Sequence, residues 1–324
     1  MKNKILITGA SGFIGTNLLE YFKNLEFEVL NLDILPPRNK KHFSCWKKTG
    51  ILDCKDITKK MNDFNPDYIV HLAARTDLDG KTCQDYSANI EGTKIVLEAA
   101  DTLNNLKKII ITSSMLVCRA GYKPKDMFDY NPSTIYGESK VQTEKIVWAN
   151  QPKCDWAIIR PTSIWGPWFD IPYRNFFDLL IAKKYFHIGN KSATKTYGYV
   201  GNAVYQIEKI LFSETFDNDD KIFYIGDEKP TNIEEWANEI AKNLNYKILK
   251  IPYSIIFIAA ILGDILKSCR ISFPMTSFRL KNMTTDNIVD LTNTIKLASH
   301  SPFTRENGIK ETLLWLSKDK LNDL

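Results

Sequence analysis

The sequence predicts an α/β fold: a doubly wound parallel sheet followed by a smaller, mostly helical C-terminal portion. Apolar strand-like runs alternate with helical segments up to residue 160, and a glycine-rich turn joins the first run to the first helix. After Pro161 the alternation stops, and helical patterns dominate from residue 231. We therefore expect a dinucleotide-binding domain over residues 1–165, with a returning segment near 197–228. Residues 166–196 and 229–324 would form the substrate-binding portion.

The first strand and helix flank the most informative turn of the chain. Residues 5–7 are an apolar run, and Gly9, Gly12 and Gly15 follow it at three-residue spacing. Gly9 would allow a tight turn, Gly12 a close approach of the backbone to phosphates, and Gly15 close packing of helix on strand. The free N–H groups and the positive end of the helix dipole would face an anion. The pattern predicts a pyrophosphate cradle.

The second strand, expected over residues 27–32, indicates which dinucleotide binds. Asp33 stands at its end, where a carboxylate accepts hydrogen bonds from ribose hydroxyls and repels a 2′-phosphate. NAD is therefore favoured over NADP. Arg38, Lys40 and Lys41 follow closely, and they keep NADP open as the less favoured cofactor.

The later strands and helices carry a candidate proton-transfer group. We expect strands over 68–72, 109–112 and 156–160, and helices over 85–103 and 134–149. Tyr136 and Lys140 share one face of the last helix, and Ser114 follows the strand 109–112. The Lys140 ammonium, with a positively charged nicotinamide nearby, would lower the pKa of Tyr136. The phenol could then exchange a proton with a substrate hydroxyl that Ser114 holds.

Composition restricts the remaining possibilities. The net charge of +5 comes from interspersed charges, which argues against a nucleic-acid-binding protein. Six cysteines without C-x-x-C pairing and four scattered histidines show no metal-ligand spacing, so we expect reduced thiols and a cytoplasmic location without a signal peptide. The apolar segment 255–266 is too short to span a bilayer. It favours a buried or dimer-facing helix, with a membrane-surface contact as the minority alternative.

Several short motifs appear together in a fixed order along the chain. They are the turn from Thr8 to Gly15, His71-Leu72-Ala73-Ala74, Asn89-x-x-Gly92-Thr93, Thr112-Ser113-Ser114, Tyr136-x-x-x-Lys140 and Arg160-Pro161-Thr162-x-x-x-Gly166-Pro167. As a set they resemble the extended short-chain dehydrogenase/reductase family, in its nucleotide-sugar epimerase/dehydratase branch. The resemblance is strong over residues 3–205 and weaker beyond, where residues 302–316 resemble the family's terminal helix.

The resemblance implies a Rossmann domain and a role for each matching residue. The residues expected to bind NAD are Gly9, Gly12, Phe13, Ile14, Gly15, Asp33, Leu72, Ala73, Ala74, Asn89, Tyr136, Lys140, Pro161, Thr162 and Ile164. Among these, Asn89 would brace the strand that bears Ser114. Ser114, Tyr136 and Lys140 would be catalytic, and Ser114, Ser163 and Lys195 would contact a nucleotide-diphosphate sugar. Lys195 falls where the family usually has an arginine, which binds phosphate in bidentate fashion. A homodimer formed by the helices 85–103 and 134–149 is also implied.

Two departures from the family's patterns bear on the reaction. Met115 and Leu116 replace the Asp-Glu pair of 4,6-dehydratases, and neither side chain can move a proton. The remaining set, Ser114, Tyr136 and Lys140, predicts an NAD-dependent 4-epimerase that works through a transient 4-keto sugar. A keto reductase, a sterol or other alcohol dehydrogenase, and a non-catalytic dinucleotide sensor remain as alternatives.

Overall fold

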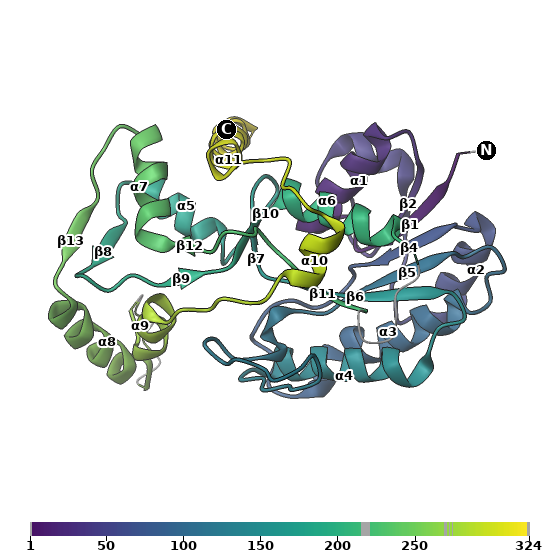
Figure 1. Cartoon of the computed structure of the whole chain (residues 1–324), viewed down its shortest axis with the longest axis horizontal. Helices are drawn as coiled ribbons and strands as arrows, with labels where there is room; N and C mark the ends of the chain where they lie inside the picture. Colours follow the sequence, from purple (N-terminus) through teal and green to yellow (C-terminus); the bar gives the residue numbers. More distant parts are fainter. Residues whose placement is uncertain (1, 215–220, 269–270, 272, 274, 323–324) are drawn as a thin grey trace.

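The computed structural model describes residues 2–214, 221–268, 271, 273 and 275–322. Figure 1 shows a larger lobe built on a sheet and a smaller lobe beside it. The sheet has seven strands in the order β11-β6-β5-β4-β1-β2-β3, and all of them are parallel. Its strands are β1 (Lys4–Thr8), β2 (Glu28–Asp33), β3 (Trp46–Lys48), β4 (Tyr68–His71), β5 (Lys108–Thr112), β6 (Asp155–Pro161) and β11 (Ile222–Ile225). The predicted doubly wound fold is confirmed.

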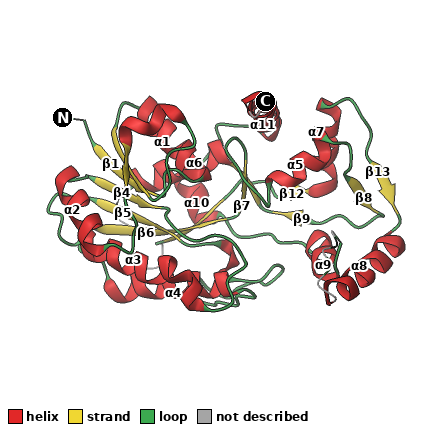
Figure 2. Ribbon diagram, turned by 180° about the vertical axis from the view of Figure 1, so that it is seen from behind, coloured by secondary structure: helices red, strands yellow, loops and turns green. Residues whose placement is uncertain are grey.

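Helices cover both faces of this sheet, as Figure 2 shows. One face carries α1 (Phe13–Asn24), α6 (Val200–Phe212) and α10 (Thr292–Leu297), and the other carries α2 (Cys54–Phe64), α3 (Ser87–Ala100) and α4 (Ile135–Asn150). Alternate residues of β1 supply the two cores: Ile5 and Ile7 pack under α1, and Leu6 packs under α3. The strand order reverses direction between β1 and β4, which is where such sheets bind ligands.

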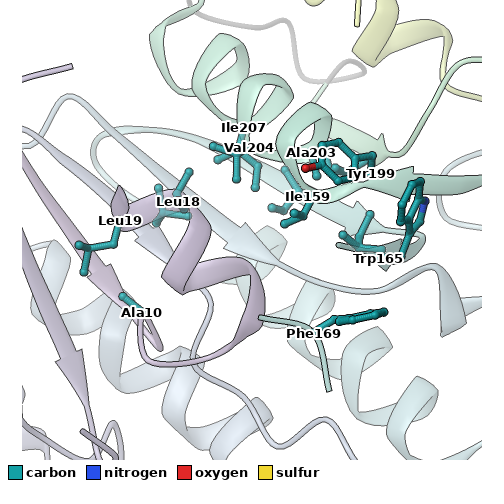
Figure 3. Packing of buried hydrophobic residues seen from close by; sticks show 14 of the residues in the cluster. Ala10, Leu18, Leu19, Ile159, Trp165, Phe169, Tyr199, Ala203, Val204 and Ile207 are labelled. Carbon is teal, nitrogen blue, oxygen red and sulfur yellow. The ribbon is translucent and has the colours of Figure 1, made fainter. Parts of the chain in front are cut away.

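The smaller lobe begins where β6 ends. It contains β7 (Ser163–Trp165), α5 (Arg174–Ile181), β8 (Phe186–Ile188), β9 (Thr194–Lys195), β10 (Tyr197–Tyr199), β12 (Thr231–Asn232), α7 (Ile233–Asn243), β13 (Leu249–Ile251), α8 (Tyr253–Ser268) and α9 (Ser277–Thr284). The long helix α11 (Arg305–Asn322) contacts α7. One hydrophobic cluster joins the lobes: Figure 3 shows Leu18 of α1 and Ile159 of β6 in the same core as Trp165, Phe169 and Tyr199. The helical C-terminal region agrees with the prediction.

For residues 255–266 the expectation of a buried helix is wrong, whereas the dimer-facing alternative stays a prediction. These residues form most of α8, but this helix is not buried within the chain, because Ile255, Ile258 and Leu262 are all more than half exposed. Only one side of α8 packs, through Ile256 and Ala260, against the small core beside α9. Among the described residues, no helix is long and apolar enough to cross a membrane. The polar segments that form β3 and α2 were not predicted.

Candidate active site

The glycine turn shapes the N-terminus of α1 as the sequence predicted. Gly9 has a φ of +77°, a conformation that L side chains rarely adopt, and a Cβ there would press on the backbone of Ala73. At Gly15 a Cβ would overlap the carbonyl oxygen of Gly9. Gly12 occupies the N-cap position, and no side chain caps the helix. The first backbone N–H groups of α1 are therefore left for an anion, so these residues fit the pyrophosphate of a dinucleotide.

Asp33 lies at the carboxyl end of β2 beside this turn. Its carboxylate accepts hydrogen bonds from the backbone N–H of Ser11 at 3.0 Å and of Leu35 at 3.0 Å. Arg38, which kept NADP open, donates instead to the carbonyl oxygens of Ser11 and Trp168 and pairs with Asp170 at 3.0 Å. The guanidinium is thus held by protein acceptors across the two lobes. This arrangement supports the predicted preference for NAD.

The loop after β4 carries Leu72, Ala73 and Ala74 and is fixed by Asn89. The Asn89 side chain accepts from the N–H of Arg75 at 2.8 Å and donates to its carbonyl oxygen at 3.0 Å. It also donates to the hydroxyl of Ser139 on α4. These bonds reach the loop after β4 and α4, so the expected bracing of the strand that bears Ser114 stays a prediction. The hydrogen bonds of the Asn89 side chain tie the loop after β4 to α4, because Asn89 lies on α3 between these two segments.

Ser114 and Tyr136 come together at the carboxyl end of β5. Ser114 caps the short 3-10 helix η3 (Met115–Val117), where its Oγ accepts the N–H of Leu116 at 3.1 Å. Tyr136 lies in the first turn of α4 and is buried beside Ser114. Burial raises the pKa of Tyr136 above its usual range, and the polar Ser114 hydroxyl opposes that shift. The two hydroxyls can hold one substrate oxygen between them.

Lys140 follows Tyr136 one turn later on α4. Its ammonium donates to the carbonyl oxygen of Thr112 at 2.8 Å, and burial lowers the pKa of Lys140 to about 8. The groups that shift the pKa of Tyr136 do not include Lys140. The protein groups therefore raise that pKa, whereas the sequence predicted a decrease. The predicted decrease also relied on the positive charge that a bound nicotinamide ring would add.

A buried polar network that the sequence analysis missed fixes α4 against β5 and β6. Glu144 and Arg160 form a fully buried ion pair, with two hydrogen bonds of 2.8 and 2.7 Å. Glu144 also accepts from Ser113 at 2.5 Å and from the hydroxyl of Tyr130 at 2.9 Å. Glu144 lies two turns beyond Tyr136 on the same helix, so the pair holds the segments that carry Ser114 and Tyr136. No local signal in the sequence indicated this pair, because Glu144 and Arg160 lie in different elements, α4 and β6.

The segment after β6 leads from the sheet into the smaller lobe. Pro161 ends β6, and the hydroxyl of Thr162 donates to the carbonyl oxygen of Ile225 at 2.8 Å. Ile164 and Ser163 are buried in β7. Ser163 lines a cavity of about 260 Å³ between α5, α7 and α9. This segment connects the predicted cofactor residues with the predicted substrate residues.

The cavity brings together basic side chains from separate parts of the chain. Lys195 lines it, and its ammonium donates to the carbonyl oxygen of Asn282 at 2.7 Å and to the side chain of the same residue. Lys191 and Arg279 also line it. Sequence reasoning missed both, because neither belongs to a local motif and Arg279 reaches the cavity only through the packing of α9. One carboxylate, Glu234, also lines the cavity and is paired with Lys250 at 3.2 Å, so the three cations outweigh it and suit a diphosphate.

Within the described part of the chain, no three His, Cys, Asp or Glu side chains are placed to hold a metal ion. The cysteines that the structure describes, Cys45, Cys54, Cys83, Cys118 and Cys154, are free thiols. Cys269 lies outside the described residues.

Comparison with known proteins places these features in context. Residues 5–226 match the model of the NAD-dependent epimerase/dehydratase family. The chain is 30% identical to N-acetyl-alpha-D-glucosaminyl-diphospho-ditrans,octacis-undecaprenol 4-epimerase of Escherichia coli O157:H7, over 97% of this chain and 95% of that protein. It is 27% identical to a decarboxylating sterol-4-alpha-carboxylate 3-dehydrogenase of Candida albicans, over 97% and 98%. The structure of a UDP-glucose 4-epimerase from Thermotoga maritima superposes with a TM-score of 0.75 at 20% identity, covering 98% of this chain and 99% of that one.

Proposed function

Because the chain belongs to the NAD-dependent epimerase/dehydratase family, we propose that it is a 4-epimerase of a diphosphate-linked sugar. The observation that carries this proposal is the placement of Ser114 beside the buried Tyr136 at the carboxyl end of β5, on the same edge of the sheet as the glycine turn after β1. The neighbouring positions hold Met115 and Leu116, which offer no further acid or base. A site with one proton-transfer group supports oxidation and reduction at a single carbinol carbon.

Each of the three proposed catalytic residues would have a separate role in the reaction. Ser114 would hold the C4 hydroxyl of the sugar, and Tyr136 would take its proton and later return it. Bound NAD supplies the chemistry of accepting a hydride from C4 and giving it back. Lys140 would bind the cofactor ribose, and the positive charge near the phenolate would come from the bound nicotinamide. Epimerisation requires the 4-keto sugar to turn within the site, so that the hydride returns to its other face.

The same residues would serve an alternative reaction. The relative from Candida albicans is named as a sterol dehydrogenase, so the family includes proteins that oxidise a hydrophobic alcohol. The basic cavity argues for a phosphorylated substrate instead, since Lys191, Lys195 and Arg279 all line it. A keto reductase with exchangeable cofactor is the remaining alternative. Tightly held NAD, released only when the protein is denatured, would distinguish the epimerase from both.

The carrier of the sugar is a separate question. The sequence predicted a nucleotide, and the relative from Escherichia coli is named for a substrate on undecaprenyl diphosphate. Both carriers present a diphosphate to the cavity. We propose the polyprenyl diphosphate, because α8, whose outer side is apolar and exposed, packs its inner side against Ile188 and Met283, which line this cavity. A soluble nucleotide sugar needs no such apolar surface.

The first prediction tests the reaction itself. Tyr136→Phe removes the proton-transfer hydroxyl, and we expect turnover to fall by about a hundredfold or more while NAD still binds. The purified protein would be incubated with N-acetylglucosamine on undecaprenyl diphosphate and, separately, on uridine diphosphate, and the C4 epimers would be quantified by NMR. Tyr122→Phe, which removes the hydroxyl of an exposed-loop tyrosine, is the control and should keep full activity. Unchanged turnover in Tyr136→Phe would refute the assignment.

A further inference from the structure

Helix α8 is apolar on the side that packs and on the side that faces solvent. Ile256 and Ala260 point into the small core beside α9 and are almost fully buried. On the opposite side, the large apolar residues are between 43% and 59% exposed, and they are Ile255, Phe257, Ile258, Ile261, Leu262 and Ile265. A helix with apolar residues all round is normally covered on every side. The outer side of α8 therefore needs a partner.

The inner side of α8 is held firmly by the segment that leads into α9. A Cβ at Gly263 would collide with the carbonyl oxygen of Met275, so the segment before α9 packs directly on α8. Asp264 accepts the backbone N–H of Ser277 at 3.1 Å. The next residue, Phe278, is 73% exposed. We call Phe278 and the six exposed apolar residues of α8 the α8 surface.

The charge around the α8 surface indicates its partner. Residues 247–284 contain six basic residues and one acidic residue, so this segment alone carries a net charge of +5, equal to that of the entire chain. Lys267 and Lys281 are exposed near the ends of α8 and α9. Lys250 pairs with Glu234 at 3.2 Å and Arg279 lines the cavity, which leaves the exposed Lys267 and Lys281 beside the apolar residues. An apolar surface flanked by exposed lysines complements a bilayer with anionic headgroups. Two copies of the same surface would bring like charges together.

We propose that the α8 surface docks the protein on an anionic lipid bilayer. The apolar side chains would enter the boundary between headgroups and acyl chains, while the opposite side of α8 stays packed on the protein. Figure 1 is consistent with this arrangement, because α8 lies at the outer end of the smaller lobe, away from the sheet. The length of α8 suits a helix that lies along the bilayer and does not cross it.

Docking would also place the cavity at the membrane. Lys191 lines the cavity, and its ammonium lies 4.1 Å from the ring centroid of Tyr253, the first residue of α8. Arg279, Asn282 and Met283 of α9 line the same cavity. A diphosphate in the headgroup region would therefore face the basic cavity. This consequence rests on the proposed function, whereas docking itself does not.

The test is co-sedimentation of the full chain with vesicles. We expect binding to vesicles of phosphatidylcholine mixed with phosphatidylglycerol, weaker binding to pure phosphatidylcholine, and loss of binding at high salt. The double variant Ile258→Glu/Ile265→Glu should reduce partitioning by about tenfold or more, because two carboxylates would enter the apolar boundary. Leu314→Glu on α11 is the matched control, since Leu314 is 56% exposed, as Ile265 is, but lies outside the α8 surface. The control should bind like the unaltered chain.

Three results would overturn the proposal. One is no binding to anionic vesicles, and another is equal loss of binding in the double variant and the control. The third is a dimer in sedimentation velocity that the double variant alone dissolves, which would assign the α8 surface to a second copy. The double variant should keep its activity on the uridine diphosphate sugar if that substrate is turned over at all. Vesicle binding without any epimerisation would contradict the proposed function and leave docking supported.

Discussion

His71 shows how a single buried residue can be misread as an acid or base. It ends β4 and is 2% exposed, with Nδ1 at 2.7 Å from the hydroxyl of Thr8 and Nε2 at 3.3 Å from that of Thr93. Burial lowers the pKa of His71 from 6.5 to about 3, with the nearby charge of Lys140 acting in the same direction. The imidazole is therefore neutral and holds β4 between β1 and α3. Its role is to position the loop that follows.

The pH dependence of stability tests this role. The unfolded chain takes up a proton on His71 below about pH 6.5 and the folded chain does not, so stability from this group is present above that pH and lost toward pH 3. Between about pH 7.5 and about pH 5.5 the loss should be about 1.4 kcal/mol. His71→Gln, which does not titrate, should lack this part of the loss in urea unfolding. Equal pH slopes for both proteins would contradict a lowered pKa.

Asp33 is the residue expected to select the cofactor. Its carboxylate accepts two backbone N–H groups, and the adjacent Arg38 is paired with Asp170. Asp33→Asn should weaken NAD binding by about tenfold and weaken NADP binding less, because repulsion of the 2′-phosphate is removed. Calorimetric titration with each cofactor measures the ratio. Asp63→Asn, an exposed aspartate of α2, controls for the change in net charge, and an unaltered ratio in Asp33→Asn would refute the assignment.

At the scale of elements, the turn between β1 and α1 depends on the absence of a side chain. Gly15→Ala would place a methyl group against the carbonyl oxygen of Gly9 and the Cα of Ala10, which are backbone atoms that cannot move aside easily. We expect a loss of about 1–3 kcal/mol in the free energy of unfolding, together with weaker NAD binding. Gly50→Ala is the matched control, because its methyl group would meet only Ile34 at an ordinary 3.6 Å. Urea unfolding compares the two, and equal stabilities would contradict the close packing.

Elements with a local signal were predictable from the sequence. The helices expected over 85–103 and 134–149 correspond to α3 (Ser87–Ala100) and α4 (Ile135–Asn150). By contrast, β3 consists of Trp46, Lys47 and Lys48, which have no strand pattern and pair with β2 only because the sheet edge is there. The sequence could not predict the surroundings of α8 either. An apolar run indicates a helix whose sides are normally covered, but it does not identify the segment or partner that covers them.

At the scale of the whole molecule, the cradle and the catalytic pair followed from motifs, and the cavity did not. Gly9 and Ser114 follow strands that the fold class already brings to one edge of the sheet, and Tyr136 lies beside Ser114 in the first turn of α4. The cavity is formed where α5, α7 and α9 meet, and α9 reaches it after a chain excursion through α8. The hydrogen bonds of the side chains that line the cavity, such as that from Lys195 to Asn282, depend on contacts between distant segments. Sequence spacing carries no information on such contacts.

The position of Lys195 depends on both a local element and a distant one. Lys195 belongs to β9, and Asn282 of α9 accepts a hydrogen bond from its ammonium where it lines the cavity. Burial lowers its pKa, and its ammonium is fixed by Asn282. If it binds the diphosphate, Lys195→Met should raise KM by about tenfold or more and leave kcat nearly unchanged, since a charge-assisted contact far from C4 is lost equally from the ground and transition states. Lys195→Arg should restore KM, because a guanidinium binds phosphate at least as well. Lys184→Met removes an exposed charge outside the cavity and should change neither constant in steady-state kinetics. A fall in kcat without a change in KM would instead place Lys195 at the reacting carbon.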